Sequence, residues 1–222
     1  MSTNLSKRDI LRQKRVQQKK RNIITAALIG AAALILILAL FLLPNILLNL
    51  SHGLGSPGFP IGDPKAPVTV YEFSSYTCSH CYDFNQNAAE AFITNYVDTG
   101  LVYFNYVNLP ADSEESLLAA KASYCAADQE KFYDYKNQLF AYASVADGFS
   151  DTNLVNYASL AGLDVDAFES CMASDKFTTA YTQDIQFASQ SGVNATPTFL
   201  VNGQDLVPTS ELEATVEKYL NN

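Results

Sequence analysis

The sequence predicts an α/β fold, in which a small mixed β-sheet carries a large helical insertion and follows one transmembrane helix. Runs of β-branched and aromatic residues occur at 68–73, 101–107 and 198–201, and helical patterns separate them. The stretch from about 113 to 191 is rich in Ala and lacks such runs, which is typical of a block of helices. A run of 21 uncharged residues, 23–43, precedes all of these segments.

The uncharged run is dominated by Ala, Leu and Ile, and as a helix it would span the roughly 30 Å of a bilayer core. Residues 1–22 hold eight Lys or Arg and one acid, a net charge of +7. By the positive-inside rule, 1–22 is a cytoplasmic tail, 23–43 is a single-pass anchor in the cell membrane, and the remainder is extracytoplasmic. A cleaved signal peptide is the alternative. The run is longer than the usual apolar region of about 7–15 residues, and no A-x-A-like cleavage site follows Leu43.

Residues 44–61 are expected to be a linker, because the stretch 51–67 contains four Gly and four Pro. A single domain follows at 62–222, long enough to bury a substantial core. The 200 residues after the tail hold six Lys, no Arg and 22 acids, a net charge of −16. Such a surface is unsuited to phosphate backbones, so nucleic acid is excluded as a partner.

The first half of the domain predicts a strand, a helix and a second strand. Residues 68–73 are mostly apolar on both faces, as in a central strand. A helix is expected from Cys78 to about Val97, where apolar residues recur at helical spacing. The second strand, 101–107, ends before Pro110.

The second half predicts the helical insertion, a hairpin and a last helix. Ser113, Asp151 and Asp164 are expected N-caps within the insertion. A third strand at 198–201 is followed by the strong turn Asn202-Gly203, a short return strand at 205–207 and a helix at 210–220.

Cys78 and Cys81 are the residues most indicative of chemistry. Three positions apart at the start of a helix, the two thiols lie on one face and close enough to bond. The helix N-terminus favours the Cys78 thiolate, and His80 between the two cysteines adds a further polar group that favours it. A stabilised thiolate makes the disulfide form a good oxidant. The spacing therefore predicts a redox-active dithiol.

Other uses of this Cys-x-x-Cys pair remain open. Zinc would need further ligands nearby, but Cys125 and Cys171 stand 46 residues apart and the second His is His52 in the linker. A permanently oxidised structural loop is another alternative. A copper-handling site made of Cys78, His80 and Cys81 is a third, although no Met cluster supports it.

Two stretches of the domain resemble the DsbA-type thioredoxin-like proteins of bacterial envelopes. They are Gly62-Asp63-Pro64-Lys65-Ala66-Pro67-Val68, continued by the run from Glu72 to Phe84 around Cys-Ser-His-Cys, and the run from Gly192 to Gly203 with Thr-Pro-Thr-Phe. The resemblance covers about 62–222 and implies a thioredoxin-like fold. It implies that Cys78 is the nucleophile that bonds to a client protein, that Cys81 is the buried resolving thiol, and that Pro197 is a cis-proline beside them. The Thr196 backbone would then pair with the client as an extra strand. From the residue alone, Pro197 would indicate only a turn or an edge.

The resemblance also assigns Glu72 and the remaining cysteines. Glu72 matches the buried carboxylate that shuttles the proton of the resolving thiol; a strand-edge Glu that reaches water is the alternative. Cys125 and Cys171 would form a second, structural disulfide, against the alternative of two buried free thiols. Ser79 departs from the family, which more often has Pro after the first cysteine, and this leaves the preferred redox direction open.

We therefore expect a thiol–disulfide oxidoreductase that introduces disulfides into reduced exported proteins and needs no bound cofactor. By resemblance, a membrane quinone-linked partner of the DsbB or vitamin-K-epoxide-reductase type would reoxidise it. A reductase or isomerase with the same residues is the nearest alternative. A non-catalytic copper-handling or assembly module is the alternative from another class.

Overall fold

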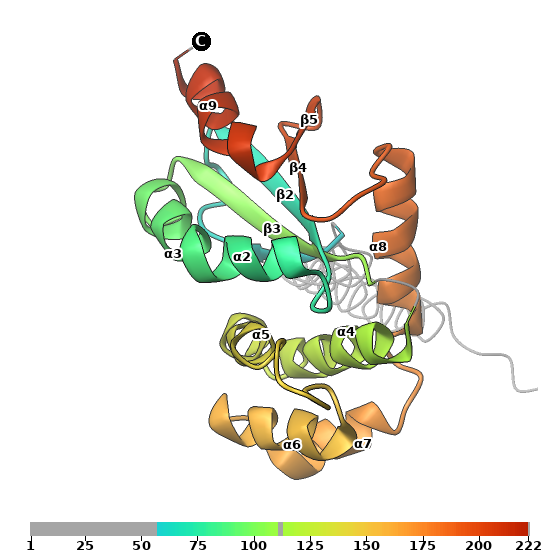
Figure 1. Cartoon of the computed structure of the whole chain (residues 1–222). Helices are drawn as coiled ribbons and strands as arrows, with labels where there is room; N and C mark the ends of the chain where they lie inside the picture. Colours follow the sequence, from blue (N-terminus) through green and yellow to red (C-terminus); the bar gives the residue numbers. More distant parts are fainter. Residues whose placement is uncertain (1–56, 111–112, 222) are drawn as a thin grey trace, which may run out of the picture. The chain divides into compact units, whose positions relative to one another are not determined.

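A computed structural model describes residues 57–110 and 113–221 of the chain (Figure 1). The predicted tail, the predicted anchor and most of the predicted linker lie outside these residues. Within the described part, no helix is both long and apolar enough to cross a bilayer.

The strands are β1 (Phe59–Ile61), β2 (Val68–Ser74), β3 (Val102–Asn108), β4 (Thr198–Val201) and β5 (Asp205–Val207). The helices are α2 (Ser79–Asn87), α3 (Ala89–Phe92), the π-helical turn η1 (Ile93–Val97), α4 (Glu114–Ala127), α5 (Phe132–Ala141), α6 (Asp151–Leu160), α7 (Val165–Met172), α8 (Thr178–Gln190) and α9 (Thr209–Leu220).

The five strands form one mixed sheet in the order β1-β3-β2-β4-β5. β2 and β3 are parallel, whereas β1, β4 and β5 run antiparallel to their neighbours. The predicted α/β architecture with a small mixed sheet is therefore confirmed, as is the helical insertion, since α4 to α8 separate β3 from β4. Figure 1 shows α4, α5, α6 and α7 gathered in one group, with α8 apart from them.

Successive side chains of the central strand β2 point to opposite faces of the sheet, and their contacts show what covers each face. Val68 and Val70 pack with apolar residues of α2, α3 and α9 on one face. Phe73 packs on the other face, with Phe187 and Ala188 of α8. Glu72 has the parity of Val70, so it points into the same face as α2. This places an acid in the interior of the protein.

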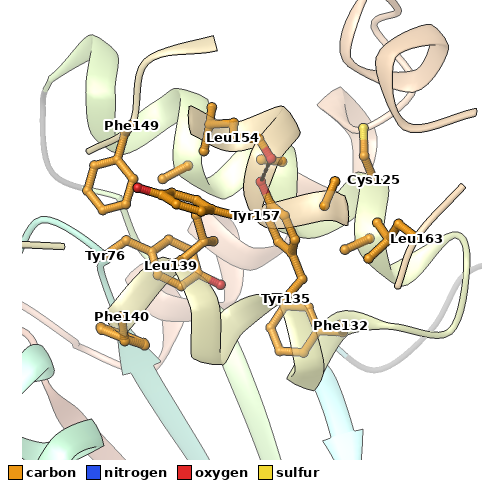
Figure 2. Close-up of a cluster of buried hydrophobic side chains, with 14 of the residues drawn as sticks. Tyr76, Cys125, Phe132, Tyr135, Leu139, Phe140, Phe149, Leu154, Tyr157 and Leu163 are labelled. Carbon is orange, nitrogen blue, oxygen red and sulfur yellow. Dashed lines mark hydrogen bonds between the residues drawn. The ribbon is translucent and has the colours of Figure 1, made fainter. Parts of the chain in front are cut away.

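The helical insertion packs around an apolar cluster that also takes in Tyr76, Cys81 and Tyr106 from outside the insertion; Figure 2 shows this cluster in close-up. Tyr135 and Leu139 are fully buried there, and the Tyr135 hydroxyl donates to the Leu154 carbonyl at 3.0 Å. Cys125 of α4 and Cys171 of α7 form a disulfide, so the pairing implied by the resemblance is present in the structure. This bond joins the first helix of the insertion to its fourth.

Three details differ from the sequence-based expectation. A short strand, β1, occupies the end of the stretch expected to be a linker, because Phe59 stacks on Phe132 with ring centroids 3.7 Å apart and β1 pairs with β3. The expected long helix is interrupted at Ala88, whose φ of −132° and ψ of −30° lie outside the helical range. The expected cap Asp151 is instead the first residue of α6, after Ser150; Ser113 and Asp164 are N-caps as predicted.

Candidate active site

Cys78 is the N-cap of α2, the position usually held by Ser, Thr, Asp or Asn. Its backbone is extended, and its sulfur accepts a hydrogen bond from the Cys81 backbone N–H at 3.4 Å. A sulfur at this position faces the unpaired N–H groups of the first helical turn, which carry partial positive charge. The start of the helix thus stabilises negative charge on Cys78.

The surroundings of Cys78 lower the pKa of its thiol. Burial alone would raise this pKa, but hydrogen bonding to Thr196, to the Cys81 thiol and to the backbone N–H groups of Cys81 and His80 outweighs burial. The contribution of His80 therefore comes through its backbone, while its side chain is exposed. Both Cys78 and Cys81 are free thiols in this structure.

Cys81 has the opposite character, although it lies only one helical turn away. It is fully buried within the core cluster of the insertion, and burial raises the pKa of its thiol to about 12. Ser74 and the Ser75 backbone oppose this rise only in part. Cys78 thus ionises readily, which suits an attacking or leaving group. Cys81 holds its proton, which suits a resolving group.

A loop from the distant end of the chain completes the site. The Thr196–Pro197 peptide bond is cis, and the Thr196 carbonyl accepts a hydrogen bond from the Cys78 sulfur at 3.3 Å. The loop lies 118 residues from Cys78 in sequence and is placed by the pairing of β4 with the central strand β2. The predicted proximity of this proline loop to the dithiol is therefore observed.

Glu72 lies on the central strand with 1% of its surface exposed, so the alternative of a strand-edge Glu reaching water is wrong. Burial raises the pKa of its carboxyl, whereas Lys136 and Ser74 lower it. Its Oε1 makes no hydrogen bond within the described part of the chain. A buried carboxyl with an unpaired oxygen is costly to the fold, which favours a role in chemistry.

Lys136 of α5 is the residue that sequence reasoning missed. It is 5% exposed, and its Nζ lies 5.4 Å from the ring centroids of both Tyr106 and Phe140. Burial lowers the pKa of this ammonium group, while Glu72 raises it. Glu72 and Lys136 line the same cavity of about 660 Å³, which separates α2 and α3 from α5. The spacing in the sequence could have indicated that Lys136 is buried. It is three and four positions before the buried Leu139 and Phe140, so it lies on the same face of the helix.

A groove of about 600 Å³ lies beside the dithiol on the side of the cis-proline. We call it the active-site groove. Its walls include Phe84 of α2, Ala88 just after that helix, Thr196 and Pro197 of the proline loop, and Thr209 at the start of α9. His80 and Asp83 stand at its dithiol end. An extended chain in this groove would lie next to both Cys78 and the Thr196 backbone.

The mixed sheet, the helix that begins at a dithiol and the opposed cis-proline together define a thioredoxin-like dithiol protein with a helical insertion. The chain belongs to the thioredoxin family: the family model described as Thioredoxin matches residues 56–221. This match covers the whole sheet and every residue of the site described above.

Similar proteins place the chain near the DsbA type within that family. It is 27% identical over 168 residues to disulfide bond formation protein D of Bacillus subtilis, covering 72% of this chain and 76% of that protein. Its structure resembles oxidised BdbD of Bacillus subtilis with a TM-score of 0.68 and 26% identity, covering 73% and 92% of the two chains. The likeness to α-DsbA1 of Wolbachia pipientis has a TM-score of 0.61 and 27% identity, covering 73% and 90%. The DsbA-type resemblance is confirmed.

A stretch of the chain is also similar to part of larger proteins. It is 32% identical over 145 residues to Na(+)/H(+) antiporter NhaA 1 of Mycobacterium sp. strain KMS. That match covers 64% of this chain but only 23% of the antiporter. The chain thus spans about a quarter of the length of these relatives, so their name describes a much larger protein.

Proposed function

We propose that this protein is a thiol–disulfide oxidoreductase that introduces disulfides into exported proteins through Cys78 and Cys81. The observation that carries the proposal is the position of Cys78: it caps a helix, its pKa is lowered, and it contacts the carbonyl of a cis-proline loop. A thiolate stabilised in this way favours the reduced form of the enzyme, so its disulfide form gives up oxidising equivalents readily.

The reaction begins when a client thiolate attacks the Cys78 sulfur of the Cys78–Cys81 disulfide. The bond between the two enzyme sulfurs breaks, Cys81 leaves with the electron pair, and a mixed disulfide forms between the client and Cys78. Because the pKa of Cys81 is raised to about 12, its sulfur takes up a proton at once; protonated Glu72 is the proposed donor.

The client's second thiolate then attacks the client sulfur of the mixed disulfide. Cys78 leaves as a thiolate, the client gains one disulfide, and two electrons have passed to the enzyme. The Thr196 backbone would hold the client as an added strand during both steps. The lowered pKa of Cys78 makes it a good leaving group in the second step.

The reaction direction is tested by equilibrating the full-length protein with glutathione buffers and measuring the redox state of the pair. A potential near −120 mV is that of a strong oxidant, and one below about −250 mV is that of a reductant. We expect a value on the oxidising side, together with oxidation of a reduced unfolded protein that Cys78→Ser abolishes. A strongly reducing potential would replace the proposal with the reductase alternative, which uses the same residues.

The copper alternative is distinguished by metal analysis of the same preparation. Stoichiometric copper lost in Cys78→Ser, with no thiol turnover in the wild-type protein, would favour a copper-handling or assembly module. The redox proposal expects turnover without a bound metal or cofactor.

We further propose that the domain faces the extracytoplasmic side of the cell membrane on a single helix at 23–43, and that a membrane quinone-linked protein of the DsbB or vitamin-K-epoxide-reductase type reoxidises it. The charge asymmetry around 23–43 and the DsbA-type relatives support this. Alkaline extraction of membranes tests the anchor: the protein should remain in the pellet, and a shortened, extractable form would indicate a cleaved signal peptide instead.

A further inference from the structure

The active-site groove continues past α2 toward the last helix. A second hollow of about 100 Å³ shares Phe84, Ala88, Thr209 and Ser210 with it, so the two adjoin, and we refer to both together as the channel. Glu213 of α9 lines the far end of this channel, and Asp83 lines the end next to His80. A client chain that reaches Cys78 would therefore run between two carboxylates.

No Lys or Arg is among the described residues that line the channel; His80, close to Asp83 in sequence, is the basic side chain in its lining. Lysines elsewhere in the described part of the chain do not line the channel, and Lys218 on the same helix as Glu213 is paired with Asp205 at 2.8 Å. Both Asp83 and Glu213 are exposed, and neither takes part in an ion pair within the described part. The walls between them are apolar or uncharged, with Phe84, Ala88 and Pro197 contributing hydrocarbon surface.

The net charge of the whole domain adds to the negative potential that Asp83 and Glu213 create in the channel. The 200 residues that follow the N-terminal tail carry a net charge of −16 and no Arg. A negative channel in a negative surface attracts cations and repels anions during encounter, and the effect weakens as salt rises.

We propose that the acidic channel selects clients with Lys or Arg close to the reacting cysteine, with Asp83 and Glu213 as specificity-determining residues. The inference rests on the proposed thiol–disulfide activity and names the substrate class of that site. A cationic residue beside the cysteine would meet Asp83, and one several residues away along an extended client would meet Glu213. The apolar floor would accept the uncharged residues between them.

The test measures kcat/KM for three dithiol peptides that differ only in having Lys, Gln or Glu beside the cysteines. The enzyme is the oxidised full-length protein in detergent, with oxidised glutathione to sustain turnover. A charge next to a cysteine also changes the thiol pKa of the peptide itself. The informative quantity is therefore the change in the Lys-to-Glu ratio of kcat/KM between enzyme variants.

Asp83→Asn combined with Glu213→Gln should lower that ratio about two- to fivefold at low salt, the size expected for exposed ion pairs. The difference should vanish at high salt. The matched control is Glu169→Gln with Asp175→Asn, which removes two exposed carboxylates from outside the channel. This control should leave the ratio unchanged.

Three results would overturn the inference in different ways. If the control pair lowers the ratio as much as the channel pair, net charge and not the channel selects clients. If neither pair changes the ratio, Asp83 and Glu213 have no role in selection. If the wild-type enzyme oxidises none of the peptides although its dithiol is intact, the proposed activity itself fails and the inference fails with it.

Discussion

At the scale of single residues, the site depends on a difference between two chemically identical side chains. Cys78 is half-buried and caps a helix, whereas Cys81 is fully enclosed one turn later. The helix start and hydrogen bonds lower the pKa of the first thiol, and burial raises the pKa of the second to about 12. Hydrogen bonding at the helix start and burial one turn later therefore act together to decide which sulfur reacts with a client.

This contrast predicts how the two thiols react with iodoacetamide across the pH range. In Cys81→Ser, Cys78 should be alkylated with an apparent pKa below the ordinary thiol value of about 8.5. In Cys78→Ser, Cys81 should stay unmodified up to strongly alkaline pH. Mass spectrometry of samples quenched at each pH gives both curves. An ordinary pKa for Cys78 would contradict the assignment of the nucleophile.

A second prediction concerns Lys136, which we expect to act as a positioning residue through Glu72. Lys136→Met removes the cation that opposes the burial of Glu72, so the pKa of the carboxyl should rise further. Because protonated Glu72 is the proposed proton donor to Cys81, the alkaline limb of the pH–kcat profile for client oxidation should move to higher pH. Met fills a similar volume, so the fold should tolerate the change.

The control for this prediction is the same substitution in a Glu72→Gln background. If Lys136 works through the carboxyl, Lys136→Met should then produce no further shift in the pH profile. An equal shift with and without Glu72 would show that Lys136 acts by another route. Unchanged alkylation of Cys78 in all three variants would show that the nucleophile itself is intact.

Sequence reasoning could identify Cys78, Cys81, Glu72 and Pro197 because each breaks a local pattern or belongs to a recognisable motif. It could not place Lys136 in the site, because the sheet and α5 meet only through tertiary packing. The length of β2 and β3 and the start of α9 were predictable to within a residue, since runs of β-branched and aromatic residues mark the strands and Pro208 precedes the helix.

At the scale of elements, the interruption of the first helix shows what a sequence pattern conceals. Apolar spacing from Cys78 to Val97 continues through Ala88, yet α2 ends at Asn87 and α3 begins at Ala89, with the non-helical Ala88 between them. No Pro or Gly marks this position, so we attribute the break to packing. The ring centroids of Phe84 and Phe199 of β4 are 4.9 Å apart, and those of Phe92 and Phe104 of β3 are 5.8 Å apart. The two halves thus fit different strands.

The disulfide between α4 and α7 predicts a measurable share of the stability of the insertion. Its cysteines are 46 residues apart, and closing a loop of that length stabilises a fold by about 4 kcal/mol on the chain-entropy model. Replacing Cys125 and Cys171 together by Ala should lower the free energy of unfolding in urea by a few kcal/mol. The redox potential of the Cys78–Cys81 pair should stay unchanged, and a large shift in it would contradict a purely structural role.

At the scale of the whole molecule, one buried carboxylate connects four parts of the domain. Asp184 of α8 accepts hydrogen bonds from the Tyr124 hydroxyl of α4 at 2.5 Å, from the Gly58 N–H beside β1 at 2.9 Å, and from the Asn108 N–H of β3 at 3.3 Å. The sheet, the first strand and the insertion therefore meet at this side chain. Its position between distant segments explains why no local sequence pattern marked it.

Asp184 predicts a specific dependence of stability on pH. Burial raises its pKa to about 6 in the folded protein, while hydrogen bonds from Tyr124, Gly58 and Asn108 lower it in part. The unfolded chain has the ordinary value near 3.8, so between about pH 4 and 6 the folded state holds a proton that the unfolded state has lost. The stabilisation that this proton provides is therefore complete below about pH 4. It is lost as the pH rises from about 4 through the folded-state pKa of about 6.

The difference between these two pKa values corresponds to about 3 kcal/mol. Asp184→Asn should flatten the decline in the free energy of unfolding between pH 4 and 7, measured by urea denaturation at closely spaced pH values. Glu72, whose pKa is also raised, contributes a decline of the same sign, so the informative quantity is the difference between wild type and variant. Asp175→Asn, an exposed acid, is the control and should retain the wild-type slope. An identical slope in Asp184→Asn would mean that this carboxyl is not the group that links the assembly of the domain to pH.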